Sequence, residues 1–513
     1  MVKKQSVKKM KIISILIVSL FLVYSFSSLI SCAKNENVAT ENNDGTTAQD
    51  GNNTDTGGEP QETTEAKLLP NLSEADFGGY EFKILTRTST DLDWLDWIPR
   101  DVFAEAETGE TINDAVYKRN TYVEDMYNFK ISQLFTDNFG NAIKKSINSG
   151  DEAYDMIESP MRDAPGFAQT GYFMNLHEVP NLDLKQPWWD QGATAALSIG
   201  GKLYSTSGDI LMVNNDTCAG IVFNKELLKD LGLDDPYPIV KDGKWTSERL
   251  YDMCKNAAKD LNGDGQMVYT DDRYGFIGQR DTLISFLHSA GEYIAQKDAD
   301  DLPYITFGSE RSYAAMEGCF KIMYDMNITH NAHHLEGKVP GIYPVSEEMF
   351  MGNRALFMWV RLRIVENLRS MDKDFGILPL PKLDEAQADY YTDVISYTGC
   401  LVCVPVTASD PARTGHILEA ICAESTYTTM PAYYDVTLKT KMARDEDSSD
   451  MLDIIFNKRV WDIGESYNFG DFSWQLIALS MKNDTNLASL FEKREPAMQK
   501  AIDKAVEKYA ALD

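Results

Sequence analysis

Apolar and polar positions follow two different periods along most of the chain. Residues 80–85 alternate as in a half-buried strand, whereas apolar side chains in residues 111–128 recur three or four positions apart, the spacing of a helix. Short apolar runs at 220–223 and 274–277 are each followed by a helical pattern. This alternation of strands and helices predicts an α/β fold, in which crossover helices cover sheets.

Length and charge narrow this picture. A single core stops growing beyond roughly 250–300 residues, so 513 residues with 43% hydrophobic content predict two cores, and hence two lobes. The chain carries 49 Lys and Arg against 79 Asp and Glu. Because phosphate binding requires a basic surface, nucleic acid is not an expected partner.

The N-terminus has the pattern of an export signal. An apolar run at 12–23 follows a group of lysines, and residues 29–32 read Leu-Ile-Ser-Cys, which resembles the bacterial lipobox. The lysines are Lys3, Lys4, Lys8, Lys9 and Lys11. We therefore expect residues 1–31 to be a lipoprotein signal peptide and Cys32 to carry the lipid that anchors the protein outside the cytoplasm. An uncleaved transmembrane anchor is the alternative.

Residues 32–70 are polar and have almost no apolar side chains, so they are predicted to form a disordered tether. Six further cysteines are widely scattered, which does not resemble a dense disulfide framework. Cys400 and Cys403 lie in an apolar strand-like run, where residues three apart face opposite ways. Neither a disulfide nor a zinc site is expected there.

Several motifs recur in an order found in one family. They are the A-Q-x-G stretch at 168–171, the G-K-x-Y sequence at 201–204, the F-N-K-E-L-L sequence at 223–228, the segment at 350–357 and the x-G-x-x-P-x-P sequence at 375–381. This order resembles the extracellular solute-binding proteins of carbohydrate transporters, the family related to maltose-binding protein. The resemblance is good over 77–423 and poor over the last ninety residues.

The resemblance implies a periplasmic-binding-protein-like fold, with two α/β lobes joined by hinge strands and a ligand cleft between them. We expect residues 78–214 and 375–425 to form lobe 1, and 218–370 and 426–513 to form lobe 2. Such proteins are monomers that perform no chemistry and need no cofactor. They deliver a small solute, here most consistent with an oligosaccharide, to the membrane permease subunits of an ATP-binding-cassette importer.

Sugar sites combine aromatic faces, which cover C–H surfaces, with planar polar groups that pair with hydroxyls. In the loop after the first strand, two closely spaced tryptophans are the best candidates. By position, the resemblance adds polar residues from the matching loops of both lobes. The predicted ligand-binding residues are Trp94, Trp97, Glu158, Arg162, Asp163, Asp209, Asp216, Gln279, Arg280, Asp281 and Arg361. Any one of these charges could instead lie on a surface loop, and Trp188 and Trp189 are interpreted equally well as core or as ligand platform.

Two segments have the composition of metal sites. The loop at 260–271 fits a calcium-loop pattern and predicts a structural Ca²⁺ bound by Asp260, Asn262, Asp264, Gln266 and Asp271. An acidic turn is the alternative, since a Glu is usual at the last position. His330, His333, His334 and Glu336 could form a metal cluster, but their closeness in sequence favours a solvated loop.

Two other functions remain open at this point. The same fold could bind a peptide or another polar solute, because the loops are charged. A surface glycan hydrolase with two cleft carboxylates is less favoured, since the sequence contains neither G-x-S-x-G nor H-E-x-x-H.

Overall fold

The computed structural model describes residues 67–512, except 88–98, 137 and 435–445. The predicted signal peptide, Cys32, most of the tether, Trp94 and Trp97 lie outside the described residues. The last four residues of the predicted tether are described and lie on the folded part, where the Leu68 amide donates to Tyr427 Oη at 2.8 Å. Within the described part of the chain, no helix has both the length and the apolarity of a membrane span.

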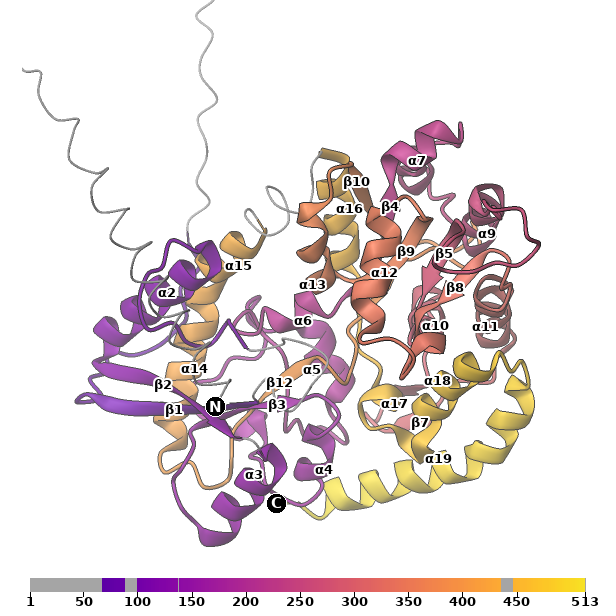
Figure 1. Ribbon diagram of the computed structural model, residues 1–513. Coiled ribbons are helices and arrows are strands. Elements are labelled where there is room, and N and C mark those ends of the chain that lie inside the picture. The colour runs from indigo at the N-terminus through magenta and orange to yellow at the C-terminus, as the bar shows by residue number, and fades with distance from the viewer. Residues whose placement is uncertain (1–66, 88–98, 137, 435–445, 513) are drawn as a thin grey trace, which may run out of the picture. The chain divides into compact units, whose positions relative to one another are not determined.

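The first sheet has four strands in the order β12-β3-β1-β2. β1 (Tyr80–Arg87) runs parallel to β2 (Phe129–Thr136) and β3 (Met156–Pro160), and β12 (Cys400–Cys403) is antiparallel to β3. α2 (Thr111–Tyr127) and α3 (Phe139–Ser149) connect the parallel strands, and α14 (Pro411–Tyr427) packs against α2. We call this part the first lobe (Figure 1). The strand predicted at 80–85 and the helix predicted at 111–128 are confirmed here.

The second sheet has five strands in the order β10-β4-β9-β5-β8. β5 (Tyr274–Gly278) runs parallel to β8 (Thr329–Asn331) and to the central β9 (Ala355–Arg361), whereas β4 (Ala219–Asn224) is antiparallel to β9. We call this sheet and its covering helices the second lobe. The helices are α9 (Ser247–Ala257), α10 (Thr282–Ser289), α11 (Glu310–Met323) and α12 (Ile342–Met351).

One strand lies in a different lobe from the one predicted. β10 (Phe375–Leu378), which we assigned to lobe 1, pairs antiparallel with β4 in the second sheet. The pairing needs a glycine, since a Cβ on Gly376 would lie 2.2 Å from Tyr237 Oη. The chain therefore returns to the first lobe after Leu378. On this return path β11 (Thr392–Asp393) pairs with β13 (Arg459–Val460).

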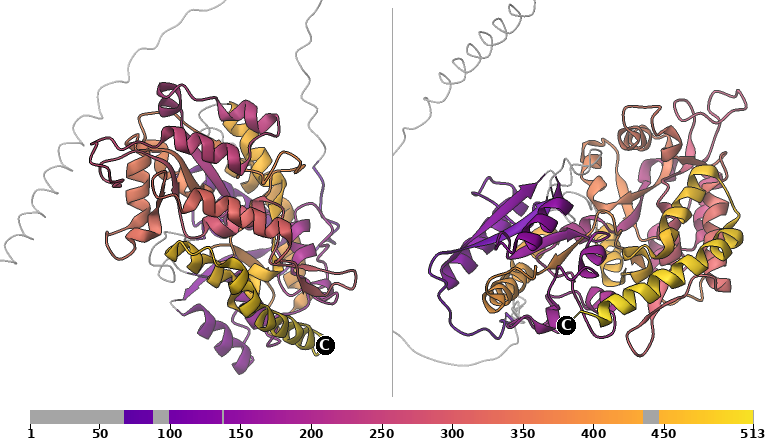
Figure 2. Two further views of the ribbon diagram at one scale, coloured as in Figure 1. Left: turned by 90° about the vertical axis from the view of Figure 1, so that its right-hand side faces the viewer. Right: turned by 90° about the horizontal axis from the view of Figure 1, so that it is seen from below.

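The C-terminal helices belong mainly to the second lobe but reach the first. α18 (Phe472–Lys482) packs against α10, and α19 (Leu487–Ala510) runs through Pro496 without a break. α19 extends along one side of the folded part (Figures 1 and 2), and the Tyr509 ring near its end lies 5.0 Å from that of Tyr204. The final helix therefore connects the two lobes.

The remaining elements connect these layers. They are α4 (Ala164–Ala168), α5 (Gln191–Leu197), α6 (Val213–Asp216), α7 (Lys225–Asp230), α8 (Pro236–Lys241), α13 (Leu362–Val365), α15 (Thr429–Ala432), α16 (Glu446–Asn457), α17 (Ile463–Ser466) and the hairpin of β6 (Ala295–Lys297) with β7 (Pro303–Ile305). Short 3₁₀ helices occur at Leu176–Glu178, Ala332–Leu335, Asn367–Ser370 and Phe469–Asp471.

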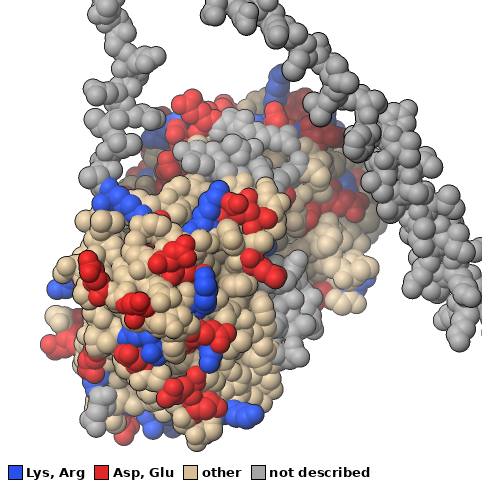
Figure 3. Space-filling view, turned by 90° about the vertical axis from the view of Figure 1, so that its left-hand side faces the viewer, with Lys and Arg blue, Asp and Glu red and all other residues tan. Residues whose placement is uncertain are grey.

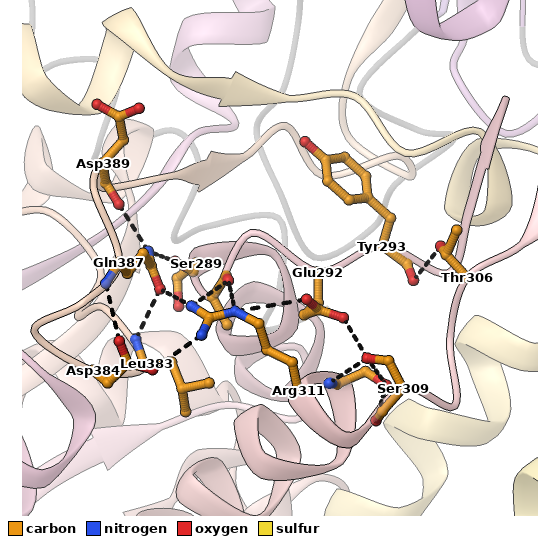
Figure 4. A network of polar contacts seen from close by, with 12 residues as sticks. Ser289, Glu292, Tyr293, Thr306, Ser309, Arg311, Leu383, Asp384, Gln387 and Asp389 are labelled. Carbon is orange, nitrogen blue, oxygen red and sulfur yellow. Dashed lines mark hydrogen bonds and ion pairs between the residues drawn. The ribbon is translucent and has the colours of Figure 1, made fainter. Parts of the chain in front are cut away.

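A polar network around Arg311 joins α10, α11 and the segment after β10 (Figure 4). The Arg311 guanidinium donates to the Ala290 carbonyl at the end of α10, to Asp384 at 3.0 Å and to Gln387 at 3.0 Å. Gln387 in turn donates to the Ser289 carbonyl at 2.7 Å. These contacts hold α10, whose first turn follows the end of β5.

Candidate functional site

Three of the predicted residues lie where strands end at their carboxyl side. Arg162 follows β3, Asp281 follows β5, and Arg361 is the last residue of β9. In open α/β sheets, ligands bind outside the carboxyl ends of the strands. The fold therefore brings these three residues, from two different sheets, to the edges where a ligand would bind.

Arg162 contacts residues from the return path and from the C-terminal region. Its Nε donates to Ser396 Oγ at 2.6 Å, and Nη2 lies 3.7 Å from Glu465 Oε1. The guanidinium carbon lies 4.3 Å from the centre of the Trp474 ring and 5.3 Å from that of Tyr397. Such distances are those of cation–π contacts, so the arginine and the two rings form one cluster.

Tyr397 and Trp474 form an aromatic pair that the sequence analysis did not identify. Their rings stack at 6.1 Å with an interplanar angle of 22°, and Trp474 is 37% exposed. An exposed indole face can cover the C–H surface of a sugar ring. Trp474 lies in the first turn of α18, which begins at Phe472 directly after the turn residues Gly470 and Asp471, so an exposed helix start was the available signal. The family resemblance is poor in this region.

Arg361 lies on the other side of Tyr397. Its Nη2 donates to Tyr397 Oη at 2.5 Å and lies 3.6 Å from Asp281 Oδ2. Burial by itself would lower the pKa of Arg361, but the nearby Tyr397 hydroxyl and Asp281 carboxylate raise that pKa overall. The guanidinium therefore stays charged within the site.

A cavity of about 540 Å³ lies next to this cluster on the second lobe. Its lining includes Arg280, His333, Glu336, Tyr343, Glu347 and Asn367. The Arg280 amide donates to His333 Nδ1 at 3.3 Å, and burial lowers the pKa of His333 to about 4. The imidazole is therefore neutral at pH 7. Ligand sites commonly have volumes of about 300–1,000 Å³, so this cavity can hold a small polar solute.

Other predicted residues are not brought to this cluster. Glu158 lies within β3 opposite Val402, not in a loop after the strand, and it is fully buried. Burial raises the pKa of Glu158 well above its usual range. The expectation that Glu158 lies in an open loop is therefore wrong, because the short apolar run of Met156 and Ile157 did not show that β3 continues to Pro160.

Three acidic residues and one amide have separate surroundings. Asp216 is buried in α6, where Arg100 and Arg363 lie 3.2 Å and 3.3 Å from its carboxylate. Asp209 accepts a hydrogen bond from the Thr426 hydroxyl at 2.6 Å, and burial raises its pKa to about 6. Asp163 is exposed before α4, and Gln279 is buried at the end of β5. A role of these four in ligand binding stays a prediction.

The predicted calcium loop is exposed and folds through its own backbone amides. The Asp260 carboxylate accepts from the amides of Gly263 at 2.6 Å and Gly265 at 2.7 Å, and Asp264 accepts from Gln266 at 2.8 Å. Among residues 67–512, as far as they are described, no group of three or more His, Cys, Asp and Glu side chains is placed to hold a metal. Calcium binding by this loop stays a prediction.

The histidine segment differs from the solvated loop that we expected. His330 is buried in β8 and stacks on Tyr269 at 5.6 Å, and His333 is buried beside Arg280. Burial lowers the pKa of His330 to about 4. The two histidines are buried because β8 pairs with β5 in the second sheet. The polar sequence of this segment does not indicate that pairing.

Trp188 and Trp189 belong to the core. Both indoles are buried, and their Nε1 atoms donate to the Glu419 carboxylate at 3.0 Å and 2.8 Å. Of the two open interpretations of this pair, the structure supports core packing. All six described cysteines are buried free thiols.

Residues 101–332 match the family model described as bacterial extracellular solute-binding protein. Among solved structures, an ABC substrate-binding protein from Listeria monocytogenes in complex with cycloalternan is 12% identical, with a TM-score of 0.50 over 85% of this chain and 100% of that chain. UspC of M. tuberculosis is 11% identical, with a TM-score of 0.53 over 82% and 100%. A cyclo/maltodextrin-binding protein complexed with maltotetraose is 12% identical, with a TM-score of 0.52 over 84% and 96%.

No curated protein matches the sequence. At identities of 11–12%, the structural likenesses establish the fold alone. That fold is periplasmic-binding-protein-like, as predicted, with two α/β lobes.

Proposed function

Residues 101–332 of this chain match the model of the bacterial extracellular solute-binding proteins, and from this premise we propose that the protein is a lipid-anchored receptor for an oligosaccharide. It would hold its ligand outside the cytoplasm and deliver it to an ATP-binding-cassette importer. The observation that carries this proposal is the cluster of Trp474, Tyr397, Arg162 and Arg361 at the carboxyl ends of strands from both sheets.

The chemistry of the cluster supports a saccharide. The partly exposed indole of Trp474 can stack on a sugar ring, and guanidinium groups can donate to hydroxyl oxygens. Arg162 comes from the first lobe and Arg361 from the second. Contacts made by both lobes only in the closed state favour closure around the ligand. Two of the similar structures have cycloalternan and maltotetraose as ligands, which is in keeping with this proposal.

A thermal screen of the purified protein tests the proposal. A ligand at a hundredfold excess over Kd stabilises the folded state by about 2.7 kcal/mol, which raises Tm by a few degrees. We expect oligosaccharides to raise Tm and Trp474→Ala to remove that shift, which is measured against the unliganded Tm of the same variant because Trp474 also packs on Tyr397 and Arg162. Tyr304→Ala, which removes an exposed ring on β7, is the matched control and should keep the shift.

Two results would contradict the proposal. If di- or tripeptides raise Tm and saccharides do not, the ligand is a peptide and the saccharide assignment is wrong, while the fold assignment is unaffected. New reducing ends after incubation with a bound oligosaccharide would point to a hydrolase instead of a receptor.

The anchor is tested separately. Because only a thiol forms the thioether to diacylglycerol, Cys32→Ser should release the protein from the membrane fraction or leave it unprocessed. Ser31→Ala, which keeps a small residue before Cys32, is the control and should be processed normally. A Cys32→Ser protein that is cleaved and still membrane-bound would show that the anchor lies elsewhere.

A further inference from the structure

Three arginines surround residues 396–398, at the start of the path into β12. We call Arg87, Arg162 and Arg361 the arginine collar. Arg87 ends β1 and donates through Nη1 to the Tyr397 carbonyl at 3.5 Å and through Nη2 to the Thr398 carbonyl. Arg162 and Arg361 donate to the side chains of Ser396 and Tyr397, as described above. Arg87 is 2% exposed, Arg361 is 5% exposed, and the Arg162 side chain is 11% exposed.

Each collar arginine keeps one buried nitrogen that has no hydrogen-bond partner. These atoms are Arg87 Nε, Arg162 Nη1 and Arg361 Nη1. The carboxylates beside Arg162 and Arg361 lie at 3.7 Å and 3.6 Å, beyond hydrogen-bond distance. Glu158, the carboxyl whose charge acts on Arg87, accepts no hydrogen bond from that arginine. Among the described residues, therefore, none of the three collar arginines donates a hydrogen bond to a carboxylate.

Arg311 has a completely paired guanidinium (Figure 4), whereas Arg100, Arg413 and Arg494, like the collar arginines, each keep one buried nitrogen without a hydrogen bond. Its Nε donates to the Ala290 carbonyl, Nη1 donates to Asp384, and Nη2 donates to both Ala290 and Gln387. Every guanidinium nitrogen of Arg311 thus has an acceptor. The collar arginines are more buried, yet they are less completely paired.

Incomplete pairing of buried guanidinium groups is unfavourable, because a desolvated charge needs an opposite charge and hydrogen bonds to compensate its lost hydration. A bound anion would supply both, and a guanidinium fork fits a carboxylate. The three collar arginines come together in a chain whose formal net charge is −30, with Glu465 beside Arg162 and Asp281 beside Arg361. On the outer face of the first lobe, by contrast, acidic and basic side chains are interspersed (Figure 3).

We propose that the ligand is an acidic oligosaccharide, whose uronate carboxylate is bound by the collar while a sugar ring stacks on Trp474. The geometry allows both contacts together, since the Arg162 guanidinium lies 4.3 Å from the centre of the Trp474 ring. This inference rests on the proposed function and names the class of saccharide. The collar atoms come from both lobes, so the carboxylate would be bound as the lobes close.

Calorimetric titration of the full-length protein with matched probes tests this inference. The probes are tetrasaccharides of galacturonate, mannuronate and hyaluronan, the methyl ester of each, neutral maltotetraose and a sulfated tetrasaccharide. Methyl esterification removes the charge and leaves the sugar otherwise unchanged. We expect one uronate to bind and its ester to bind at least about tenfold more weakly, because charge-assisted hydrogen bonds are lost.

Substitutions of the collar arginines test whether these residues cause the preference for the acid over its ester. Arg162→Gln and Arg361→Gln should each weaken binding of the acid by about tenfold or more and bring acid and ester closer together in affinity. Arg311→Gln, the control from the paired network, should keep the preference for the acid. If the glutamine variants fail to fold, Arg162→Lys and Arg361→Lys keep the charge but lose the fork, and should give a smaller loss of the same kind.

Each contrary result has a distinct meaning. Tight binding of maltotetraose or of an ester would overturn the acidic class and leave the saccharide receptor intact, as would an unchanged preference in the arginine variants. Binding of the sulfated probe alone would overturn the carboxylate assignment. If none of the saccharides binds, the proposed function itself fails, and this inference fails with it.

Discussion

At the residue scale, one carboxylate accepts hydrogen bonds from two buried indoles. Glu419 Oε1 accepts from Trp188, whereas Oε2 accepts both from Trp189 and from the Asp183 amide at 3.2 Å. All three side chains are almost fully buried, so each hydrogen bond replaces water that has been lost. The two tryptophans are neighbours in sequence, yet the oxygen that accepts from Trp188 has one donor and the oxygen that accepts from Trp189 has two.

This difference predicts unequal effects of two matched substitutions. Trp188→Phe removes the only donor to Oε1, while Trp189→Phe leaves Oε2 with the Asp183 amide. Both should lower the free energy of unfolding, because a buried acceptor without a partner costs about 1–3 kcal/mol, and Trp188→Phe should lower it more. Urea unfolding checks this, and both variants should bind saccharide normally. Loss of binding without loss of stability would place the pair in the ligand site.

At the element scale, a glycine in α14 permits close contact with another segment. A Cβ on Gly415 would lie 2.0 Å from the Pro180 carbonyl oxygen. Gly318 in α11 is also helical, but a Cβ there would meet Ser247 at 3.7 Å, an ordinary contact. Glycine has low helix propensity, and replacing it by alanine usually stabilises a helix interior by about 0.5–1 kcal/mol.

The two glycines should therefore respond with opposite signs. Gly318→Ala should raise the free energy of unfolding by up to about 1 kcal/mol. Gly415→Ala should lower it by about 1–3 kcal/mol, because overpacking forces α14 away from Pro180. Denaturation midpoints of the two variants measure this directly. A stabilising Gly415→Ala would mean that α14 can move at no cost.

The loop at 260–271 provides a second prediction at this scale. If it binds a structural calcium ion, chelation should lower Tm and added calcium should restore it, because a ligand of the native state alone stabilises by mass action. Asp264→Ala should abolish this response. Asp300→Ala, in the turn between β6 and β7, is the control and should keep it. Melting curves that coincide with and without chelator would leave the loop an acidic turn.

At the scale of the whole molecule, several buried groups make stability depend on pH in one direction. Burial raises the pKa of Asp393 to about 6 and that of Glu419 to about 7. Burial alone would lower the pKa of His288, but its hydrogen bond to Asp462 raises it to about 9. Each of these groups binds its proton more tightly in the folded state than in the unfolded chain, where the pKa values of Asp, Glu and His are about 3.9, 4.3 and 6.5.

These three groups therefore lower the free energy of unfolding as pH rises from about 4 to about 9. His330 and His333, whose pKa burial lowers to about 4, oppose this fall between about pH 4 and about pH 6.5, so the net fall is expected above about pH 6.5. His288→Gln should flatten this dependence only above about pH 6.5, where the unfolded imidazole loses its proton. Glu419→Gln should flatten it between about pH 4.3 and about pH 7. Urea midpoints across this range test both windows. Stability that rises with pH between about 7 and about 9 would contradict the assignment to His288.

Much of the fold follows from local pattern. The strand at 80–85, the helix at 111–128 and the alternation of strands and helices are encoded by the spacing of neighbouring apolar residues, which fixes which face of each element is buried. Motifs in the matched region add the resemblance to the solute-binding proteins, and this resemblance predicted the fold. They also led to Arg162, Asp281 and Arg361, because residues that follow strands lie at the carboxyl edge whatever the sheet partners are.

Only the tertiary structure decided which segments meet. The periodicity of β10 shows that it is buried but not that it pairs with β4, about 150 positions earlier. Glu158 lies in a strand buried on both faces, where alternation no longer separates inside from outside. The pairing of Arg162 with Ser396 and Trp474 spans more than 200 positions. Local sequence determines which face of its helix or strand each residue occupies. A binding site is built from contacts between elements, and these contacts depend on how the whole chain packs.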